Sequence, residues 1–210
     1  MRPPTGLILI TDRRSAAHPL ETICAAALEA GFAGVMLREK DLPARPLLEL
    51  AQPLAALCRE SGAMFWVNER LDVALAVAGA GGHVGSRGLS VPASRALLGA
   101  DRSLGYSAHE ADEARRALDQ GADFVFLSPV FPGVSKPEAP ARGFTWFRDA
   151  VTFLPPRTVF ALGGVTAKTV GQVMACGAAG AAVMGTVMRA GDPGRVAREI
   201  ASAAESAGSS

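Results

Sequence analysis

The segment Gln120-Gly121-Ala122-Asp123-Phe124-Val125 decides how this sequence folds, because a glycine in it joins a helix-like stretch to an apolar run. Glycine ends a helix at little steric cost by accepting a left-handed backbone, and the apolar residues that follow suit a buried strand. Segments with the same order stand at 30–35, 78–84 and 176–181. The sequence therefore repeats a helix-to-strand junction.

Short and nearly continuous apolar runs alternate with segments of helical periodicity along the chain. The runs, which we interpret as eight strands, are 7–11, 34–38, 63–68, 82–85, 103–107, 124–128, 158–162 and 179–184. Such runs are typical of parallel strands that are covered on both faces. Eight strand-helix units predict an α/β fold, a single (β/α)8 TIM barrel. A doubly wound open sheet is the alternative, but segment 11–15 lacks the GxGxxG fingerprint expected there.

The composition indicates one domain that handles a small molecule. The 210 residues include 49% hydrophobic side chains, enough for one core, and the formal net charge is +1. A near-neutral chain has no field for gathering nucleic acid or an acidic membrane. We assign the barrel to residues 1–202 and expect the Ala/Ser/Gly-rich residues 203–210 to be a disordered tail. A homo-oligomer is compatible with the sequence, which does not fix the oligomeric state.

The N-terminal region and the cysteines bear on the compartment. The apolar run 7–10 is too short for a signal peptide or a membrane span, so we expect a cytoplasmic protein. Cys24, Cys58 and Cys176 stand far apart without a CxxC pair, which predicts neither a disulfide framework nor a metal knuckle. We expect each to be a small buried hydrophobe.

Polar residues and glycines gather where the predicted strands end, the face on which TIM barrels carry their chemistry. Gly163-Gly164 follows the seventh strand and Gly185-Thr186 the eighth, the usual place for a phosphate. Glycines let backbone N–H groups approach phosphate oxygens, and a following helix start would add its positive end. As an isolated dipeptide, Gly-Gly is more often a simple turn.

Two further strand ends carry candidate site residues. Arg38 and Lys40 alternate at the end of the second strand, so we expect them to point the same way and to clasp one anionic group. A solvated surface pair is the alternative. Glu39 should point oppositely and form ion pairs. His109 follows the fifth strand, where its pKa range suits proton transfer, unless it only caps the next helix. His83 lies within a strand and suggests a core role.

Five short motifs, taken in order, resemble the thiamine-phosphate synthase/TenI family. They are Leu37-Arg38-Glu39-Lys40, the segment 67–75 (VNERLDVAL), Gly105-Tyr106-Ser107-Ala108-His109, Ser128-Pro129-Val130-Phe131-Pro132 with Ser135-Lys136, and Ala161-Leu162-Gly163-Gly164-Val165. Each motif is short, but the ordered set covers nearly the whole chain. The resemblance implies a TIM barrel of thiamin biosynthesis whose members either join a pyrimidine pyrophosphate to a thiazole phosphate with Mg²⁺ or tautomerise a thiazole phosphate.

The resemblance also implies roles for individual residues. Arg38, Lys40 and Asn68 match the pyrophosphate site of the synthases. Ser107 matches a polar group beside the pyrimidine, and Ser135 and Lys136 fall in the mobile loop, which carries a lysine. Gly163 and Gly164, with Gly185 after the eighth strand, match the site of the thiazole phosphate. His109 falls where the tautomerases place a catalytic histidine.

The sequence departs from the synthase pattern at the expected metal ligands. Met36 replaces a glutamine that contacts the pyrimidine, Glu69 replaces the first metal-ligand aspartate, and Gly88 stands near the position of the second. Mg²⁺ bridges pyrophosphate oxygens to carboxylates, so the loss of the carboxylate near Gly88 weakens this site. Gly133 and Gly185 also replace a threonine and a serine that are common in synthases.

These departures favour a thiazole tautomerase, which needs a phosphate cradle and an acid/base group but no metal. Replacing His109 with Asn should then abolish the tautomerisation. Thiamine-phosphate synthase is the alternative, with Mg²⁺ as its cofactor and Glu69 as a ligand. A barrel that binds thiazole phosphate or thiamin phosphate without turnover is the third. A phosphate-handling isomerase of another pathway would leave the five ordered motifs unexplained.

Overall fold

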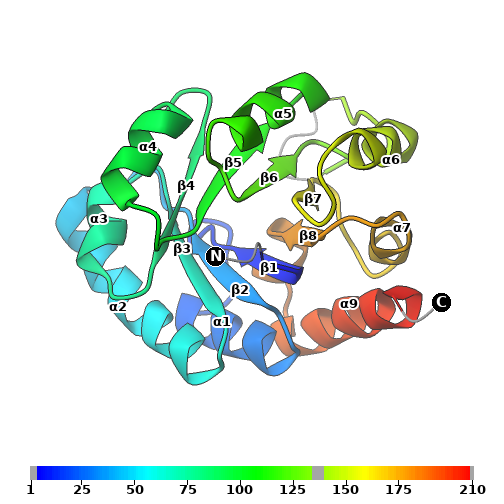
Figure 1. Ribbon diagram of the computed structural model, residues 1–210. Helices are drawn as coiled ribbons and strands as arrows, with labels where there is room; N and C mark the ends of the chain where they lie inside the picture. Colours follow the sequence, from blue (N-terminus) through cyan, green and yellow to red (C-terminus); the bar gives the residue numbers. More distant parts are fainter. Residues whose placement is uncertain (1–3, 134–139, 209–210) are drawn as a thin grey trace.

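The computed structural model describes residues 4–133 and 140–208 and forms a closed barrel of parallel strands surrounded by helices (Figure 1). Each strand pairs with the next along the chain, and β8 closes the barrel on β1. The strands are β1 (Gly6–Ile10), β2 (Gly34–Leu37), β3 (Met64–Asn68), β4 (Gly81–Gly85), β5 (Leu104–Ala108), β6 (Phe124–Leu127), β7 (Val159–Leu162) and β8 (Gly180–Val183). The predicted (β/α)8 TIM barrel is confirmed, and closure excludes the open sheet.

Helices follow the strands and cover the outside of the barrel (Figure 1). They are α1 (Leu20–Glu29), α2 (Ala44–Glu60), α3 (Leu71–Ala76), α4 (Val91–Leu98), α5 (Ala111–Asp119), α6 (Phe144–Phe153), α7 (Val170–Ala175), α8 (Gly185–Met188) and α9 (Pro193–Gly208). Helix α8 is a single turn, so α9 supplies the outer cover next to β8 and packs between α7 and α1.

The four predicted helix-to-strand junctions are confirmed by their backbone conformation. Gly31, Gly79, Gly121 and Gly177 have φ angles of 90°, 73°, 108° and 86°. An L-residue would be strained in this left-handed region, which is why glycine recurs at the same point of the unit. The repeat visible in the sequence therefore reflects a backbone requirement.

Aromatic rings fill the interior of the barrel, and glycines on neighbouring strands leave the space that these rings occupy. Trp66, Phe124 and Phe160 are at most 1% exposed, and Phe124 lies 5.4 Å from Trp66 and 5.6 Å from Phe160 between ring centroids. A Cβ on Gly81 would lie 2.5 Å from the Trp66 ring, and one on Gly105 would lie 2.4 Å from the Phe124 ring. Bulky rings against glycines thus pack the barrel without a channel.

The C-terminal residues form a helix and not the disordered tail expected from the sequence. The sequence predicts a disordered tail over 203–210, but α9 continues to Gly208. Ala197, Ile200, Ala201 and Ala204 are all less than 9% exposed, and their spacing places them on one helix face. The small side chains that suggested disorder form the buried stripe of the last helix.

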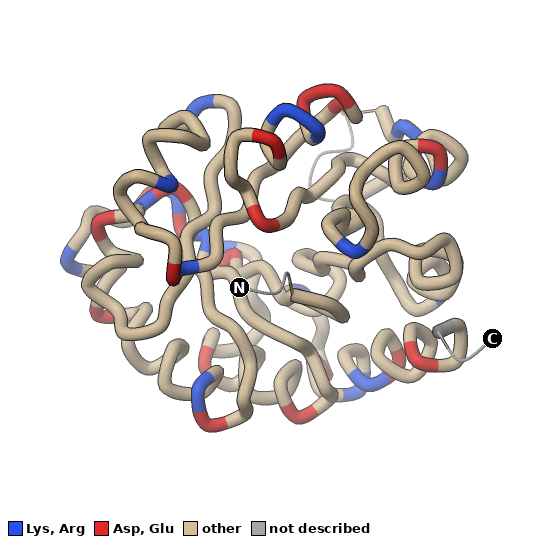
Figure 2. The backbone as a smooth tube through the Cα atoms, in the orientation of Figure 1, with Lys and Arg blue, Asp and Glu red and all other residues tan. Residues whose placement is uncertain are grey.

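The charged residues and the cysteines lie largely where the sequence led us to expect them. Figure 2 shows basic and acidic residues interspersed along the outer helices and loops. No helix in the described part of the chain is long and apolar enough to cross a bilayer. Cys24 and Cys58 are buried and unpaired, as predicted, and burial raises the pKa of the Cys58 thiol to about 12. Cys176 is only half-buried, because it lies at the end of α7.

Candidate active site

A cavity of about 290 Å³ opens at the carboxyl ends of the strands, where the sequence placed the site. Seven predicted residues line it, namely Arg38, Asn68, Ser107, His109, Gly163, Gly164 and Gly185. Met36 and Leu162 are among the apolar side chains of its wall. The predicted residues Ser135 and Lys136 lie outside the described residues. The cavity thus combines polar groups from several strands with an apolar surface that suits a flat ring.

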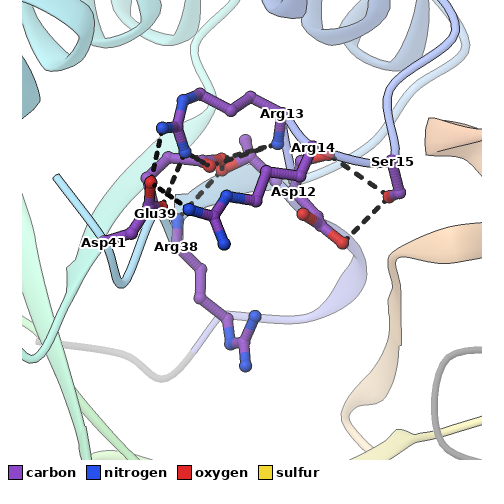
Figure 3. Close-up of polar contacts among 8 residues, drawn as sticks. Asp12, Arg13, Arg14, Ser15, Arg38, Glu39 and Asp41 are labelled. Atoms are coloured by element: carbon purple, nitrogen blue, oxygen red, sulfur yellow. Dashed lines mark hydrogen bonds and ion pairs between the residues drawn. The ribbon is translucent and has the colours of Figure 1, made fainter.

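The backbone of Arg38, just after β2, is held through Thr11 by the buried carboxylate of the neighbouring Glu39 (Figure 3). The side chain of Glu39 is 2% exposed and accepts a hydrogen bond of 2.7 Å from Thr11 Oγ1. Thr11 Oγ1 in turn accepts a bond of 2.9 Å from Arg38 N, and Arg13 forms an ion pair of 3.2 Å with Glu39. Asp41 accepts hydrogen bonds from both Nη1 and Nη2 of Arg13, and this guanidinium holds the pKa of the Asp41 carboxyl well below its usual range.

This network fixes the backbone of Arg38 and leaves its side chain to the cavity. Figure 3 shows the Arg38 side chain pointing away from the carboxylates of Glu39 and Asp41. The ion pairing predicted for Glu39 is confirmed. Because Glu39 is occupied by Thr11 and Arg13, it does not neutralise the Arg38 guanidinium.

Lys40 does not join Arg38 at the cavity, contrary to the prediction from strand alternation. β2 ends at Leu37, and the chain then turns with a hydrogen bond of 3.2 Å from Leu42 N to Glu39 O. Alternation of side chains applies only while the strand continues. Lys40 Nζ instead lies 3.5 Å from Glu69 Oε1, in a partly exposed ion pair beside the cavity.

The residues at the expected magnesium site do not fit that ion. Glu69 does not line the cavity and pairs with Lys40, and Gly88 brings no carboxylate. A Cβ on Gly88 would lie 3.7 Å from Glu69 Cγ, so the second carboxylate of the family would stand directly beside the first. Over residues 4–133 and 140–208, no group of three or more His, Cys, Asp or Glu side chains could hold a metal. One ion-paired carboxylate is a poor donor set for Mg²⁺.

His109 is held in one orientation at the rim of the cavity. Its Nδ1 lies 2.8 Å from Ser128 O, and a carbonyl oxygen only accepts, so Nδ1 donates to it. Glu113 accepts a bond of 2.8 Å from His109 N and another of 2.8 Å from the hydroxyl of Tyr106. Burial and this carboxylate raise the pKa of Tyr106 to about 12. With Nδ1 bound to Ser128 O, Nε2 is the ring nitrogen that His109 has left for a ligand.

His83 supports the floor of the site from inside the barrel, as its position within a strand predicted. It is 1% exposed, its ring lies 4.8 Å from that of Phe126, and Nε2 lies 3.5 Å from Ser107 Oγ. Burial, followed by the charges of Arg38 and Lys40, lowers the pKa of His83 to about 3. The ring is therefore neutral near pH 7.

Gly163 and Gly164 are required by conformation and by close packing. Their φ angles are 96° and 64°, and a Cβ on Gly164 would lie 2.4 Å from Pro132 O. Within residues 4–133 and 140–208, the N–H group of Gly164 donates to no protein acceptor. A Cβ on Gly133 would lie 3.5 Å from that nitrogen, so the glycine there leaves the amide uncovered. Gly164 N is thus a donor available to an anion.

The loop after β8 joins the same end of the cavity. Thr186 Oγ1 donates to Val165 O at 2.9 Å and ties the two glycine-containing loops together. In the described part of the chain, the N–H group of Gly185 also has no acceptor. The predicted help from a helix start is not realised, because α8 has only four residues and its dipole is correspondingly small.

Thr166 and Arg189 are polar residues of the cavity wall that were not singled out in the sequence. Thr166 follows the glycine pair, and Arg189 follows α8. Nothing in the sequence marked Thr166. Arg189 stands four residues after Gly185, a spacing that a helical turn places on one face, and this could have been recognised.

These features define a TIM-barrel protein whose cavity suits a small phosphorylated molecule. Residues 7–187 match the family model described as thiamine monophosphate synthase. The chain is 36% identical over 197 residues to "Thiamine-phosphate synthase" of Moorella thermoacetica, covering 92% of each chain. It is 38% identical over 203 residues to the protein of the same name from a Roseiflexus species, covering 94% of this chain and 85% of the other.

A solved structure agrees with the sequence relatives. "Thiamine phosphate pyrophosphorylase from Pyrococcus furiosus" superposes with a TM-score of 0.87 at 31% identity, over 97% of this chain and 96% of that one. The chain belongs to the thiamine-phosphate synthase/TenI family, as its motifs predicted. It is therefore a member of an enzyme family of thiamin biosynthesis.

Proposed function

We propose that this protein is a thiamine-phosphate synthase, a transferase that joins a hydroxymethylpyrimidine pyrophosphate to a thiazole phosphate and releases pyrophosphate. From the sequence, this activity is the alternative to a thiazole tautomerase. The relatives that bear the synthase name favour it over the tautomerase. The observation that carries the proposal is one cavity lined both by Arg38 and by the glycine-containing loops after β7 and β8, which supports the binding of two anionic substrates side by side.

The reaction requires one bond to break and one to form. The C–O bond between the pyrimidine methylene and pyrophosphate breaks with its electron pair on the leaving oxygen, and the lone pair of the thiazole nitrogen forms the new C–N bond. Arg38 and Asn68, at the carboxyl ends of the neighbouring strands β2 and β3, would stabilise charge on the leaving group, and Ser107 would contact the pyrimidine. The amides of Gly164 and Gly185 would hold the thiazole phosphate, so that the nitrogen faces the methylene carbon.

The cation requirement of this synthase should differ from that of family members with two metal carboxylates. Mg²⁺ supplies charge neutralisation on pyrophosphate when it is bound, but the site around Glu69 and Gly88 does not fit it. Charge on the leaving pyrophosphate then falls to the chain's own donors, foremost Arg38. We expect Arg38→Gln to lower kcat/KM by at least a hundredfold.

The test is to incubate the protein with both substrates over a series of Mg²⁺ concentrations and to measure pyrophosphate and thiamin phosphate. Formation of both products in equal amounts supports the synthase. Arg148→Gln serves as the control for a lost surface charge, since Arg148 pairs with Asp149 outside the cavity wall. Thermal stabilisation by the substrates without product would instead indicate the binding barrel.

A thiazole tautomerase is a second candidate, favoured by His109. The bond from Nδ1 to Ser128 O leaves Nε2 at the cavity, where it could take a proton from a ring carbon and return it to a neighbouring one. His109→Asn keeps a donor for Ser128 O but has no group in place of Nε2. This variant should abolish tautomerisation of the thiazole carboxylate phosphate, measured as exchange of the transferred proton in D₂O. Exchange at the wild-type rate would exclude His109 as the base.

A further inference from the structure

We infer that Arg189 is a phosphate ligand at the β8 end of the cavity and that Gly185 is glycine because this guanidinium occupies the space of a side chain. This inference rests on the proposed function, since it assigns a further residue to the thiazole phosphate half of the site. Neither the family motifs nor the proposed mechanism includes Arg189.

The first observation is the contact between Arg189 and Gly185. A Cβ on Gly185 would lie 2.2 Å from Arg189 Nη2, 2.6 Å from Cζ and 2.6 Å from Nη1. All three distances are far below van der Waals contact, so the guanidinium lies against the glycine Cα. The turn of α8 sets this arrangement, because Arg189 N donates to Gly185 O at 3.2 Å and the two residues share a helix face.

The second observation is the charge of the cavity wall. Arg38 and Arg189 are its arginines, and none of the described residues that line it is acidic. Arg189 shares this wall with the glycine-containing loops, including Gly164 and Thr186. A phosphate there would meet backbone N–H groups and a guanidinium, and such charge-assisted hydrogen bonds are stronger than those from neutral amides alone.

The contact also explains a departure noted in the sequence. Gly185 replaces a serine that is common in synthases, and a serine side chain would have to displace the Arg189 guanidinium from this position. The chain thus carries an arginine above a glycine where a hydroxyl would otherwise stand. A fork of charged donors replaces one neutral donor, which should raise the preference for a phosphorylated over a dephosphorylated thiazole.

The experiment compares the binding of thiazole phosphate and of the thiazole alcohol by calorimetry. Arg189→Gln should weaken thiazole phosphate binding by about tenfold or more and leave alcohol binding unchanged. Arg189→Lys should recover part of the loss, because it keeps the charge but not the fork. Arg148→Gln, a matched loss of an exposed arginine outside the cavity wall, should bind both compounds as the wild type does.

A double-mutant cycle tests whether position 185 is a glycine because of the Arg189 guanidinium. Gly185→Ser should weaken thiazole phosphate binding about as much as Arg189→Gln, because the serine displaces the guanidinium. The double variant Gly185→Ser/Arg189→Gln should bind no worse than Arg189→Gln alone. Additive losses would show that the two positions act separately and would overturn the stated reason for the glycine.

Inorganic phosphate separates this inference from the proposed function. If the wild type binds inorganic phosphate but not the thiazole phosphate, the thiazole assignment fails, and weaker phosphate binding by Arg189→Gln still supports Arg189 as the ligand. Unchanged affinity in Arg189→Gln, or an equal loss for the alcohol, overturns the inference. Binding of neither phosphate compound by the wild type overturns both.

Discussion

Acidification should destabilise this protein through His83, the neutral histidine packed among the barrel's aromatic rings. Its pKa is lowered to about 3 in the folded chain and is 6.5 when the chain is unfolded. Between these values the unfolded state binds a proton that the folded state does not, so stability falls as the pH falls. The stability that the neutral His83 ring contributes is fully present above pH 6.5 and is lost progressively between pH 6.5 and about 3.

The size of the effect follows from the two pKa values. Each pH unit within this window is worth about 1.4 kcal/mol, so going from pH 7 to pH 5 should lower the free energy of unfolding by about 2 kcal/mol. With a denaturant slope of about 2–3 kcal/mol/M, the urea midpoint should fall by roughly 0.7–1 M. Carboxylates titrate mainly below this range, so His83 should dominate the slope.

Urea unfolding of the wild type and of His83→Gln at pH 7, 6 and 5, followed by tryptophan fluorescence, measures this effect. The glutamine variant should be less stable at pH 7 and should lose much less stability on acidification. His18→Gln is the matched control, because His18 is exposed and contacts Gly191 O at 2.9 Å. It should keep the wild-type pH dependence. Equal slopes for the wild type and His83→Gln would refute the reasoning.

Three substitutions test other features of the molecule. Gly105→Ala places a Cβ 2.4 Å from Phe124 Cζ and should cost about 1–3 kcal/mol by urea unfolding, whereas Gly171→Ala, with nothing nearer than 3.6 Å, should not destabilise. Arg157→Gly relieves a φ angle of 58° and should raise stability by about 0.5–1 kcal/mol, and a lowered midpoint would contradict this. Gly88→Asp adds a carboxylate beside Glu69 without overlap and should increase Mg²⁺ binding in a calorimetric titration, while Gly88→Asn should not.

The fold could be predicted because its determinants are local and repeated. The junction glycines, such as Gly31 and Gly121, answer a backbone requirement that each unit meets by itself. The prediction of a disordered tail was wrong because the order of these residues depends on packing against the rest of the barrel and not on a local signal. Ala201 and Ala204 look like low complexity in the sequence, and only their spacing on the buried face of α9 shows that they pack.

The site could be predicted where a residue's place on a strand fixes its direction, and not where the chain leaves the strand. Arg38, Asn68 and Ser107 lie at or next to strand ends and line the cavity as expected. Lys40 lies in the turn that follows β2, so alternation no longer decides where it points. Arg189 is placed by a single helical turn against Gly185, a contact that no sequence motif marks.

The closed barrel brings the two ends of the site together, because β8 pairs with β1, which pairs with β2. Arg38 after β2 and Arg189 after β8 therefore line one cavity, and no acidic side chain joins them among its described wall residues. Two anionic substrates could share such a cavity at a lower electrostatic cost than one lined by carboxylates. Gly88 then becomes the position that separates the two candidate reactions, since a carboxylate there would complete a cation site that only pyrophosphate release needs. If Gly88→Asp raises the synthase rate in the presence of Mg²⁺, the native cavity is limited by charge on the leaving group. If the rate is unchanged, the chain's own cations already neutralise that charge.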